Sequence, residues 1–375
     1  MGNKEIRVLH IDSELKWGGG QQQAIYLFEG MLNKGYYASF VCRPKSELKR
    51  YLKKHKLPYF EFKMSSEIDI LSSYKIASFC KKNKINILYL HSAGAHAIGL
   101  MAKVFYPELK IIVVRRVSYD IRKNYLSQLK YKSSLINMFV CISNDIKNVL
   151  LRNGINKEKL RVIHDGIDLN KFTNIKSNSN LRKELEIPES DIVIGTIAAL
   201  EGAKDYPNLL NSAKIVLQKV HNVSFVAIGD GRDRYKIKEL HNKLNLGKKF
   251  IFTGFQDDVS KYLLLFDIFV LASKEEGLGT SILDAQSLGL PVVATKAGGI
   301  PEVVKHNING VLVNPQNPQE LASAIIDLVD DKAKREQLGR NGKESVKDFD
   351  INLNVKRHID LINSMLNVGD VGSIG

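Results

Sequence analysis

The stretch IFVLASKEEGLGTSILDAQSLGLPVVAT, residues 268–295, carries the pattern that decides the fold. It predicts a short apolar strand, a glycine turn, a helix that ends at a glycine, and a second apolar strand. The turn from Glu276 to Thr280 should leave free backbone N–H groups at the start of the helix, where phosphate binds well. Glu276 and Asp284 add carboxylates that can accept hydrogen bonds from sugar hydroxyls. Phosphate and hydroxyl groups together indicate a nucleotide-sugar ligand.

The same alternation of strands and helices extends along the whole chain. Apolar, β-branched runs separated by helical patterns predict parallel sheets that are covered on both faces. The candidate strands form two series, the first at 6–11, 38–42, 87–90, 111–114, 138–142 and 161–163, and the second at 192–197, 224–228, 250–253, 268–271, 291–294 and 311–313. We therefore expect an α/β protein with two Rossmann-like, doubly wound domains that face each other across a cleft.

The domain boundaries are expected near the polar stretch Asn174–Asn180. We predict an N-terminal domain over residues 1–172 and a C-terminal domain over residues 173–352. A last helical pattern, 353–366, opens the segment 353–375; we expect it to cross back to the N-terminal domain and expect the tail from residue 369 to fray.

Bulk composition is that of a water-soluble globular protein. The 375 residues are 44% hydrophobic and 25% charged, and no apolar run approaches the roughly 20 residues that span a bilayer. The N-terminus has no signal-peptide core. The three cysteines, Cys42, Cys80 and Cys141, lie far apart in or beside apolar stretches, which favours reduced buried thiols in a cytoplasmic protein.

Positive charge is concentrated in the first half of the chain. Through residue 171 there are 30 Lys and Arg against 14 Asp and Glu, whereas the remainder holds 25 against 26. Such asymmetry indicates an anionic partner, which could be a membrane surface, a charged glycan or nucleic acid. The basic segment Ser46–Lys56, with Leu48, Tyr51 and Leu52 on one side, and the aromatic and basic segment 119–139 suit an anionic membrane surface. The alternative is a solvated lysine-rich face. Nucleic acid would not account for the acids and glycines of the other half.

Ligands of open α/β sheets bind beyond the carboxyl ends of the strands, and the first half carries candidate groups there. Gly18, Gly19 and the next glycine precede a predicted helix over 22–32 and would allow close approach of a ligand, although a tight turn is the alternative. His91 follows the strand at 87–90. Arg115 and Arg116 end the next strand and suit anion binding, with a solvated basic edge as the alternative.

The second half has its own series of strand ends. Lys204 precedes a predicted helix over 206–218, where an ammonium could neutralise a diphosphate. Gly229 and Gly231 follow the next strand and give a turn with free N–H groups, or only terminate the strand. We find no residue spacing typical of a metal site.

In this order, these motifs resemble those of the family 4 (group 1) retaining glycosyltransferases of the GT-B fold. The matching residues run from Lys204-Asp205 through Gly229-Asp230-Gly231 and Glu276–Gly279 to 289–295 and 298–302, with VIHDGID at 162–168 as the inter-domain segment. The resemblance implies sugar transfer with retention from a nucleotide-diphosphate sugar, of UDP or GDP type, without a metal or other cofactor.

The resemblance also implies roles for single residues. It places Lys204 and the backbone of Gly18 and Gly19 near the diphosphate, and Glu276 on the donor sugar. Asp284 would hold the ribose, and His91 would contact the transferred sugar. Donor-binding turns would be formed by Gly229, Gly231, Gly277, Leu278, Gly279 and Thr280.

Two positions depart from the family pattern. Ala199 stands where many members have an arginine, and Arg115 or Arg116 could supply that charge. Asp284 stands where a glutamate is usual, so its ribose contact would shift slightly or pass through water.

We therefore expect a cytoplasmic hexosyltransferase-type enzyme, peripheral on the inner face of the cell membrane, that acts on a glycan or lipid-linked acceptor in lipopolysaccharide or cell-surface polysaccharide biosynthesis. One alternative is a GT-B nucleotide-sugar epimerase, which needs no acceptor. Another is a non-catalytic subunit that binds nucleotide-sugar, which Ala199 alone favours.

Overall fold

The computed structural model describes residues 5–172 and 180–367, which form two compact units. The first unit contains residues 1–166 and 351–375, and the second contains residues 167–350. The sequence placed these boundaries at 172/173 and 352/353. The chain enters the second unit earlier because the Ile167 N–H donates to the Phe349 carbonyl at 2.9 Å and Ile167 bridges Asp350. The predicted linker centre and frayed tail lie outside the described residues.

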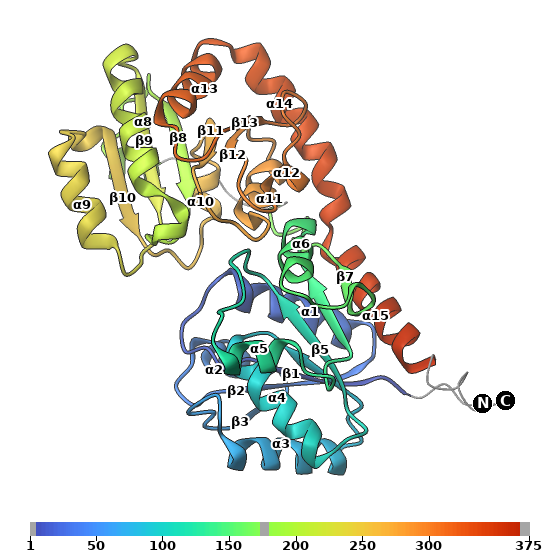
Figure 1. The fold of residues 1–375 in the computed structure, drawn as a ribbon. Coiled ribbons are helices and arrows are strands. Elements are labelled where there is room, and N and C mark those ends of the chain that lie inside the picture. Colours follow the sequence, from blue (N-terminus) through green and yellow to red (C-terminus); the bar gives the residue numbers. More distant parts are fainter. Residues whose placement is uncertain (1–4, 173–179, 368–375) are drawn as a thin grey trace. The chain divides into compact units, whose positions relative to one another are not determined.

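The first unit is built on a seven-stranded parallel sheet in the order β3-β2-β1-β4-β5-β6-β7 (Figure 1). Its strands are β1 (Arg7–Ile11), β2 (Tyr37–Cys42), β3 (Tyr59–Glu61), β4 (Ile87–Leu90), β5 (Lys110–Arg115), β6 (Met138–Cys141) and β7 (Leu160–Val162). Its helices are α1 (Gly19–Asn33), α2 (Glu47–Lys54), α3 (Ile70–Lys82), α4 (Ala93–Phe105), α5 (Tyr125–Tyr131), α6 (Asn144–Arg152), the short 3-10 helix η1 (Lys157–Lys159) and α15 (Ile351–Asn367).

The second unit has a six-stranded parallel sheet in the order β10-β9-β8-β11-β12-β13. Its strands are β8 (Ile192–Ile197), β9 (Val223–Ile228), β10 (Phe250–Gly254), β11 (Ile268–Leu271), β12 (Val292–Thr295) and β13 (Val311–Val313). The helices are α7 (Leu181–Glu184), α8 (Tyr206–Lys219), α9 (Arg234–Lys243), α10 (Ser260–Leu263), α11 (Thr280–Ser287), α12 (Ile300–Val303), α13 (Pro318–Asp330) and α14 (Lys332–Ser345), with 3-10 helices η2 (Gly202–Lys204), η3 (Gly247–Lys249) and η4 (Val346–Phe349). Both sheets confirm the predicted α/β class.

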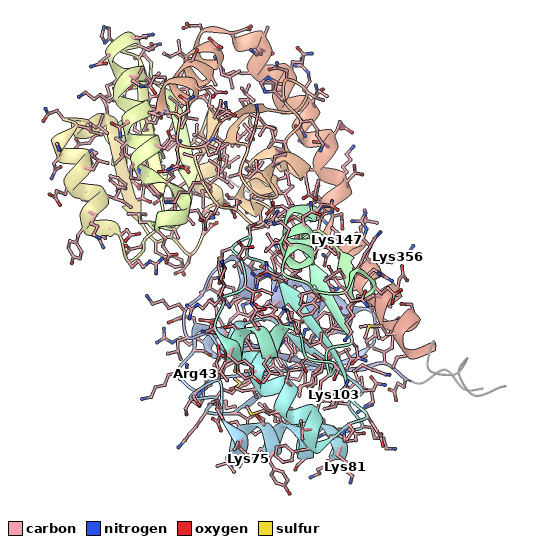
Figure 2. All side chains as sticks on the ribbon, viewed as in Figure 1. Arg43, Lys75, Lys81, Lys103, Lys147 and Lys356 are labelled. Carbon is pink, nitrogen blue, oxygen red and sulfur yellow. The ribbon has the colours of Figure 1, made fainter. Side chains whose placement is uncertain are left out.

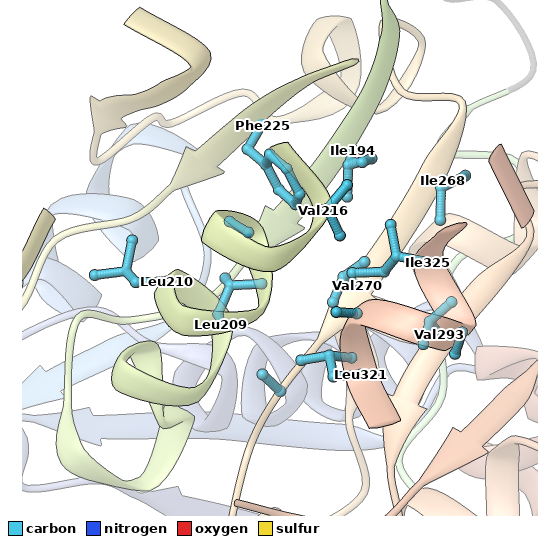
Figure 3. Packing of buried hydrophobic residues seen from close by; sticks show 14 of the residues in the cluster. Ile194, Leu209, Leu210, Val216, Phe225, Ile268, Val270, Val293, Leu321 and Ile325 are labelled. Atoms are coloured by element: carbon cyan, nitrogen blue, oxygen red, sulfur yellow. The ribbon is translucent and has the colours of Figure 1, made fainter. Parts of the chain in front are cut away.

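Burial on both faces explains why the strands are continuous apolar runs rather than alternating ones. All residues of β4, β9 and β11 are buried. In the second unit, the side chains of α8 and α13 pack on the strands, as Figure 3 shows for Leu209 and Val216 of α8 and for Leu321 and Ile325 of α13 around Val270. Such burial supplies the main favourable term for folding. The three cysteines are also free and buried, as predicted.

The terminal helix α15 belongs to the first unit, where it packs along α1. The two helices approach closely at Gly30, where a Cβ would come within 2.4 Å of a Val355 methyl group. A buried hydrogen bond of 2.8 Å joins the Tyr89 hydroxyl on β4 to Nδ1 of His358 on α15. The last helix therefore completes the unit that the first residues begin.

Helix α2 corrects one expectation about the basic half. Its apolar residues Leu48 and Leu52 are fully buried against the core of the first unit, and Tyr51 stacks on His55 and lies against the tilted ring of Trp17. The apolar stripe of this helix is therefore not available to a membrane. In contrast, α5 has no buried residue, and it exposes Tyr125 and Leu129 as the aromatic and basic pattern suggested.

Candidate functional site

The carboxyl edge of the first sheet carries the glycine turn that the sequence predicted. Strand β1 ends at Ile11, and buried Asp12 follows; its carboxylate accepts hydrogen bonds from the Glu14 N–H at 2.8 Å and the Gln21 side chain at 3.0 Å. Helix α1 then begins at Gly19 with Gly18 as its N-cap and no side-chain capping bond. The N-terminal N–H groups of α1 are therefore not capped by a side chain and suit an anionic or hydroxyl-bearing ligand.

His91 lies directly after β4 on the same edge and is almost fully buried. Its Nε2 is 2.9 Å from Nδ1 of His10, and its Nδ1 is 3.3 Å from Nη1 of Arg116. An arginine N–H can only donate, so Nδ1 of His91 must accept and Nε2 must carry the proton. That proton is donated to His10. Both ring nitrogens of His91 are thus engaged within the first unit, and its orientation and tautomer are fixed.

The histidines of this group are uncharged in the folded protein. Burial, reinforced by the nearby Arg116 charge, lowers the pKa of His10 to about 3 and that of His91 well below its ordinary value. His358 behaves in the same way, with its pKa lowered to about 3 by burial and by Arg116. Arg116 beside them is paired with the carboxylate of Asp165, in keeping with the high cost of burying an unpaired charge.

Arg116 and Asp165 form a buried ion pair, with Nε of Arg116 3.2 Å from the carboxylate and side chains 12% and 5% exposed. Burial raises the pKa of Asp165, and the Arg116 charge opposes that rise. Arg116 also lies against the first turn of α1, because a Cβ at Gly20 would come 3.7 Å from its Cδ. Of the two predicted arginines, Arg116 is therefore the one at the glycine turn.

Arg115 has a different role from the one predicted. It is 4% exposed, and its guanidinium donates to the Tyr131 hydroxyl at 2.5 Å and to the Tyr119 carbonyl. Its guanidinium carbon also lies 5.1 Å from the centre of the Tyr131 ring. Arg115 therefore anchors the segment that leads to α5, and it does not face the strand-end edge with a free guanidinium.

In the second unit, the structure brings two predicted residues into direct contact. Nζ of Lys204, at the end of η2, is 2.5 Å from Oε2 of Glu276, which also accepts a hydrogen bond of 3.2 Å from the Ser273 hydroxyl. The Lys274 and Glu275 N–H groups both donate to the Ala203 carbonyl and so hold the two loops together. Ammonium and carboxylate groups thus meet where β8 and β11 end.

The glycine turn after Glu276 has the geometry that the sequence indicated. Gly279 is the N-cap of α11 with φ of 87°, in the left-handed region that favours glycine, and α11 begins at Thr280 without a side-chain cap. The Leu278 side chain is buried, so only its backbone can meet a ligand. The Gly299 N–H donates to the Glu276 carbonyl at 3.1 Å, which joins the turn to the next strand end. The turn therefore presents uncapped N–H groups beside the Lys204–Glu276 pair.

Asp284 lies in the same helix, α11. Its side chain is 19% exposed, and its Oδ2 is 3.7 Å from Nζ of Lys171. Burial raises the pKa of Asp284, and Lys171 opposes that rise. Asp284 therefore has a cationic neighbour that the sequence analysis did not identify.

Gly229 and Gly231 have a packing explanation. A Cβ at Gly229, whose φ is 141°, would lie 2.1 Å from the Ala198 carbonyl oxygen, and one at Gly231 would lie 2.5 Å from that of Leu200. Because neither glycine has a Cβ, the backbone at the end of β9 can pack directly against the backbone that follows β8. Any contact of these two residues with a ligand would have to come from their backbone.

Three further residues lie near these groups and were not predicted as site residues from the sequence: His10, Asp165 and Lys171. His10 sits in an ordinary strand pattern, and only the pairing of β1 with β4 places it near His91. Asp165 belongs to the VIHDGID segment, which offered a signal, but its arginine partner is 49 residues away in sequence.

No cluster of three or more His, Cys, Asp or Glu side chains with an arrangement suited to a metal ion occurs among residues 5–172 and 180–367. Within the same residues, none of the helices combines the length and apolar character needed to cross a bilayer.

Comparison with protein families gives two matches that together cover most of the chain. Residues 17–171 match the family described as Glycosyltransferase Family 4, and residues 177–345 match the family described as Glycosyl transferases group 1.

Similar individual proteins include a UDP-Gal:alpha-D-GlcNAc-diphosphoundecaprenol alpha-1,3-galactosyltransferase of Escherichia coli, 23% identical over 88% of this chain and 89% of that protein. An N-acetyl-alpha-D-glucosaminyl L-malate synthase of Bacillus anthracis is 27% identical over 74% of each chain. The fold is similar to that of Anabaena HepE in complex with UDP and glucose, with a TM-score of 0.83, 22% identity, and coverage of 96% of this chain and 100% of that one. A glycosyltransferase of Rickettsia africae gives a TM-score of 0.84 at 22% identity, and the match covers 96% of this chain and 99% of that one.

Proposed function

The chain belongs to the family 4, group 1 glycosyltransferases of the GT-B fold, and from this membership we propose that it moves a sugar from a nucleotide-diphosphate sugar to a glycan or lipid-linked acceptor, with retention of the anomeric configuration. We place this reaction in cell-surface polysaccharide or lipopolysaccharide biosynthesis. The proposal is supported by relatives with such acceptors, among them the diphosphoundecaprenol-directed galactosyltransferase.

The contact between Lys204 and Glu276 is the observation that carries the proposal. These residues come from two loops, they meet at 2.5 Å, and they lie beside the uncapped start of α11. A lysine ammonium and helix N–H groups suit the diphosphate of a donor, while a carboxylate suits the hydroxyls of its sugar. In the proposed complex, Lys204 turns toward the diphosphate and Glu276 accepts from the sugar hydroxyls.

The chemistry follows from where charge develops. Transfer breaks the bond between the anomeric carbon and the diphosphate oxygen, and the electron pair stays on the diphosphate. A new bond forms between the anomeric carbon and an acceptor hydroxyl oxygen, whose proton passes to the released diphosphate. Fixed positive groups aimed at that oxygen stabilise the transition state more than the ground state. Lys204 and the N–H groups of Leu278 to Thr280 supply such groups without a metal, so we propose a metal-independent reaction. Glu276 would hold the sugar in place as the bond breaks.

Asp284 and the first unit complete the proposal. Asp284 would accept from the ribose hydroxyls, with Lys171 holding its carboxylate. In the first unit, Gly18, Gly19 and the His91–Arg116 group would take part in ligand recognition. Because the guanidinium of Arg115 is held by Tyr131 and Tyr119, Arg116 is the arginine that we propose for recognition of an anionic ligand in the first unit.

We further propose that the protein works in the cytoplasm on the inner face of the cell membrane. Buried free cysteines suit a reducing compartment, and a basic first half suits an anionic surface.

A transfer assay with a panel of UDP-, GDP- and ADP-sugars tests the function. Glu276→Gln and Lys204→Ala should each lower transfer at least about 100-fold while the fold stays intact. NMR of the product tests retention, and chelation of divalent metals tests metal independence. Turnover of donor alone into an epimer, or donor binding with no transfer to any acceptor, would refute the proposed reaction.

Neighbouring residues supply matched controls. Glu275→Gln and Lys274→Ala make the same chemical changes at exposed side chains in the loop that contains Glu276, and they leave the backbone bonds to Ala203 in place. Both controls should keep near-normal transfer. If they lose as much activity as the Glu276 and Lys204 variants, the site assignment is wrong.

A further inference from the structure

Exposed apolar side chains are concentrated in the first unit. Among the described residues, thirteen exposed large apolar side chains belong to the first unit and four to the second. Nine of the thirteen lie on or beside three helices and define what we name the α3–α4–α5 surface: Ile68, Ile70, Leu71, Tyr74, Val104, Phe105, Tyr125, Leu126 and Leu129. Clusters of this kind on a water-soluble protein mark interaction sites more often than single exposed apolar residues do.

Side-chain contacts join the parts of this surface. The Tyr74 ring of α3 meets the Phe105 ring of α4 edge to face, with centroids 5.5 Å apart. Lys130 of α5 is 2.9 Å from the Glu67 carboxylate, next to Ile68, and 3.3 Å from the Ala93 carbonyl at the start of α4. Helix α4 packs against both other helices, and Figure 1 shows it between α5 and α3. The three helices that carry the nine side chains are therefore neighbours joined by direct contacts.

Helix α5 shows most clearly that the first unit itself does not cover these apolar side chains. It has no buried residue, and Tyr125, Leu126 and Leu129 are 77%, 65% and 58% exposed. It is held through its polar and aromatic residues, Lys130 and Tyr131, rather than through its leucines. A helix whose leucines point outward is stabilised little by burial in the core of its own unit. This arrangement is expected when its apolar side contacts something outside the protein.

The charge of the same region indicates which kind of partner contacts these apolar side chains. Residues 63–132 contain 13 Lys and Arg against 4 Asp and Glu. Lys75 and Lys81 of α3, labelled in Figure 2, are exposed, as are Arg122, Lys123 and Lys132 around α5. A second copy of this surface would bring like charges together, and nucleic acid would leave the leucines uncovered. An anionic bilayer satisfies both the apolar and the basic groups.

We propose that the α3–α4–α5 surface docks on an anionic lipid bilayer, with its apolar side chains among the headgroups and its lysines and arginines against lipid phosphates. This proposal deepens the proposed function. It rests on that function in one respect only, namely that the acceptor is linked to a lipid. The Ala93 end of the surface is two residues from His91 in sequence. A docked lipid-linked acceptor would thus arrive beside the strand-end edge of the first unit.

Vesicle flotation with the full chain tests the proposal. At low salt, the protein should float with vesicles of phosphatidylcholine and phosphatidylglycerol at roughly 3:1, bind phosphatidylcholine alone at least about 10-fold more weakly, and detach in part at about 0.5 M NaCl. Leu126→Asp/Leu129→Asp should weaken binding to the anionic vesicles at least about 10-fold, because two apolar contacts are replaced by charges that the lipid repels. Tyr235→Asp, at an 86% exposed tyrosine of the second unit, is the matched control and should bind normally.

The remaining outcomes are each decisive. Failure of the wild-type protein to float with anionic vesicles overturns the proposal, as does equal loss in the control variant. A wild-type dimer that the double variant dissociates would show that a second copy covers the surface instead. Transfer to a water-soluble acceptor should be unchanged in the double variant. Because vesicle binding does not depend on transfer, a protein that floats but transfers nothing would refute the proposed function and leave this surface assigned.

Discussion

Removing the carboxylate of Asp165 should destabilise the first unit more than the removal of any exposed ion-pair partner. Asp165 is 5% exposed and Arg116 is 12% exposed, so Asp165→Ala leaves a guanidinium with little access to water. Breaking a buried pair from one side costs about 3–5 kcal/mol. Arg116 keeps its contact with His91 and some solvent, so we expect the lower end, about 3 kcal/mol, or roughly 6–12 °C in Tm for a unit of this size.

The chain offers a convenient probe for this measurement. Its single tryptophan, Trp17, lies in the first unit, so urea unfolding followed by Trp17 fluorescence reports on that unit. Arg116→Met should also destabilise the unit, because it leaves Asp165 buried without its partner. The double variant should recover most of the loss, with a coupling energy of at least about 2 kcal/mol.

An exposed pair in the same unit serves as the control. Glu47 and Arg50 are 42% and 72% exposed, and Glu47→Ala should cost no more than about 0.5 kcal/mol. If Asp165→Ala costs no more than Glu47→Ala, or if the two single changes at the buried pair add without coupling, the reasoning about this pair is refuted.

The other predictions concern pH, packing and the donor. Burial lowers the pKa of His10, His96 and His358 to about 3 from the ordinary 6.5, so the unfolded chain binds more protons than the folded protein between these pH values. The free energy of unfolding should therefore be largest above pH 6.5 and fall as the pH drops. Each of the three histidines should contribute a loss of up to about 1.4 kcal/mol per pH unit. His96→Phe should flatten that slope in urea titrations at pH 5 to 7, and an unchanged slope would contradict it. Gly229→Ala should destabilise the second unit by more than about 2 kcal/mol in calorimetry, whereas Gly35→Ala, with φ of 80° but open space for a Cβ, should cost about 1 kcal/mol. Asp284→Ala should raise KM for the donor about 10-fold with little change in kcat, and a donor that lacks the ribose hydroxyls should show no such difference between variant and wild type.

The fold was predictable because each strand carries its own signal. The runs at 87–90 and 268–271 coincide with β4 and β11, since strands buried on both faces must be apolar throughout. The one strand that the sequence analysis missed among the described residues is β3. It is three residues long, it lies at the sheet edge, and it exposes Phe60 and Glu61, so it had no apolar run to detect.

The site was predictable only where single loops carry the information. The glycine turn around Gly279 and the Lys204 and Glu276 side chains could be placed at strand ends by counting strands. Contacts between distant segments could not, because no local pattern states which strand end lies next to another. Asp165 meets Arg116, and His10 meets His91, only after β7 and β1 have taken their places in the sheet.

The position of α15 bears on the order in which the protein is made. The second unit is one continuous segment, so a ribosome completes it while the final helix is still to be synthesised. The first unit, although begun earlier, lacks the helix that packs on Gly30 and bonds Tyr89 until α15 emerges from the ribosome. A nascent chain should therefore gain a protease-resistant second unit first, with the first unit held open, its α1 face exposed to chaperones, until α15 has been synthesised.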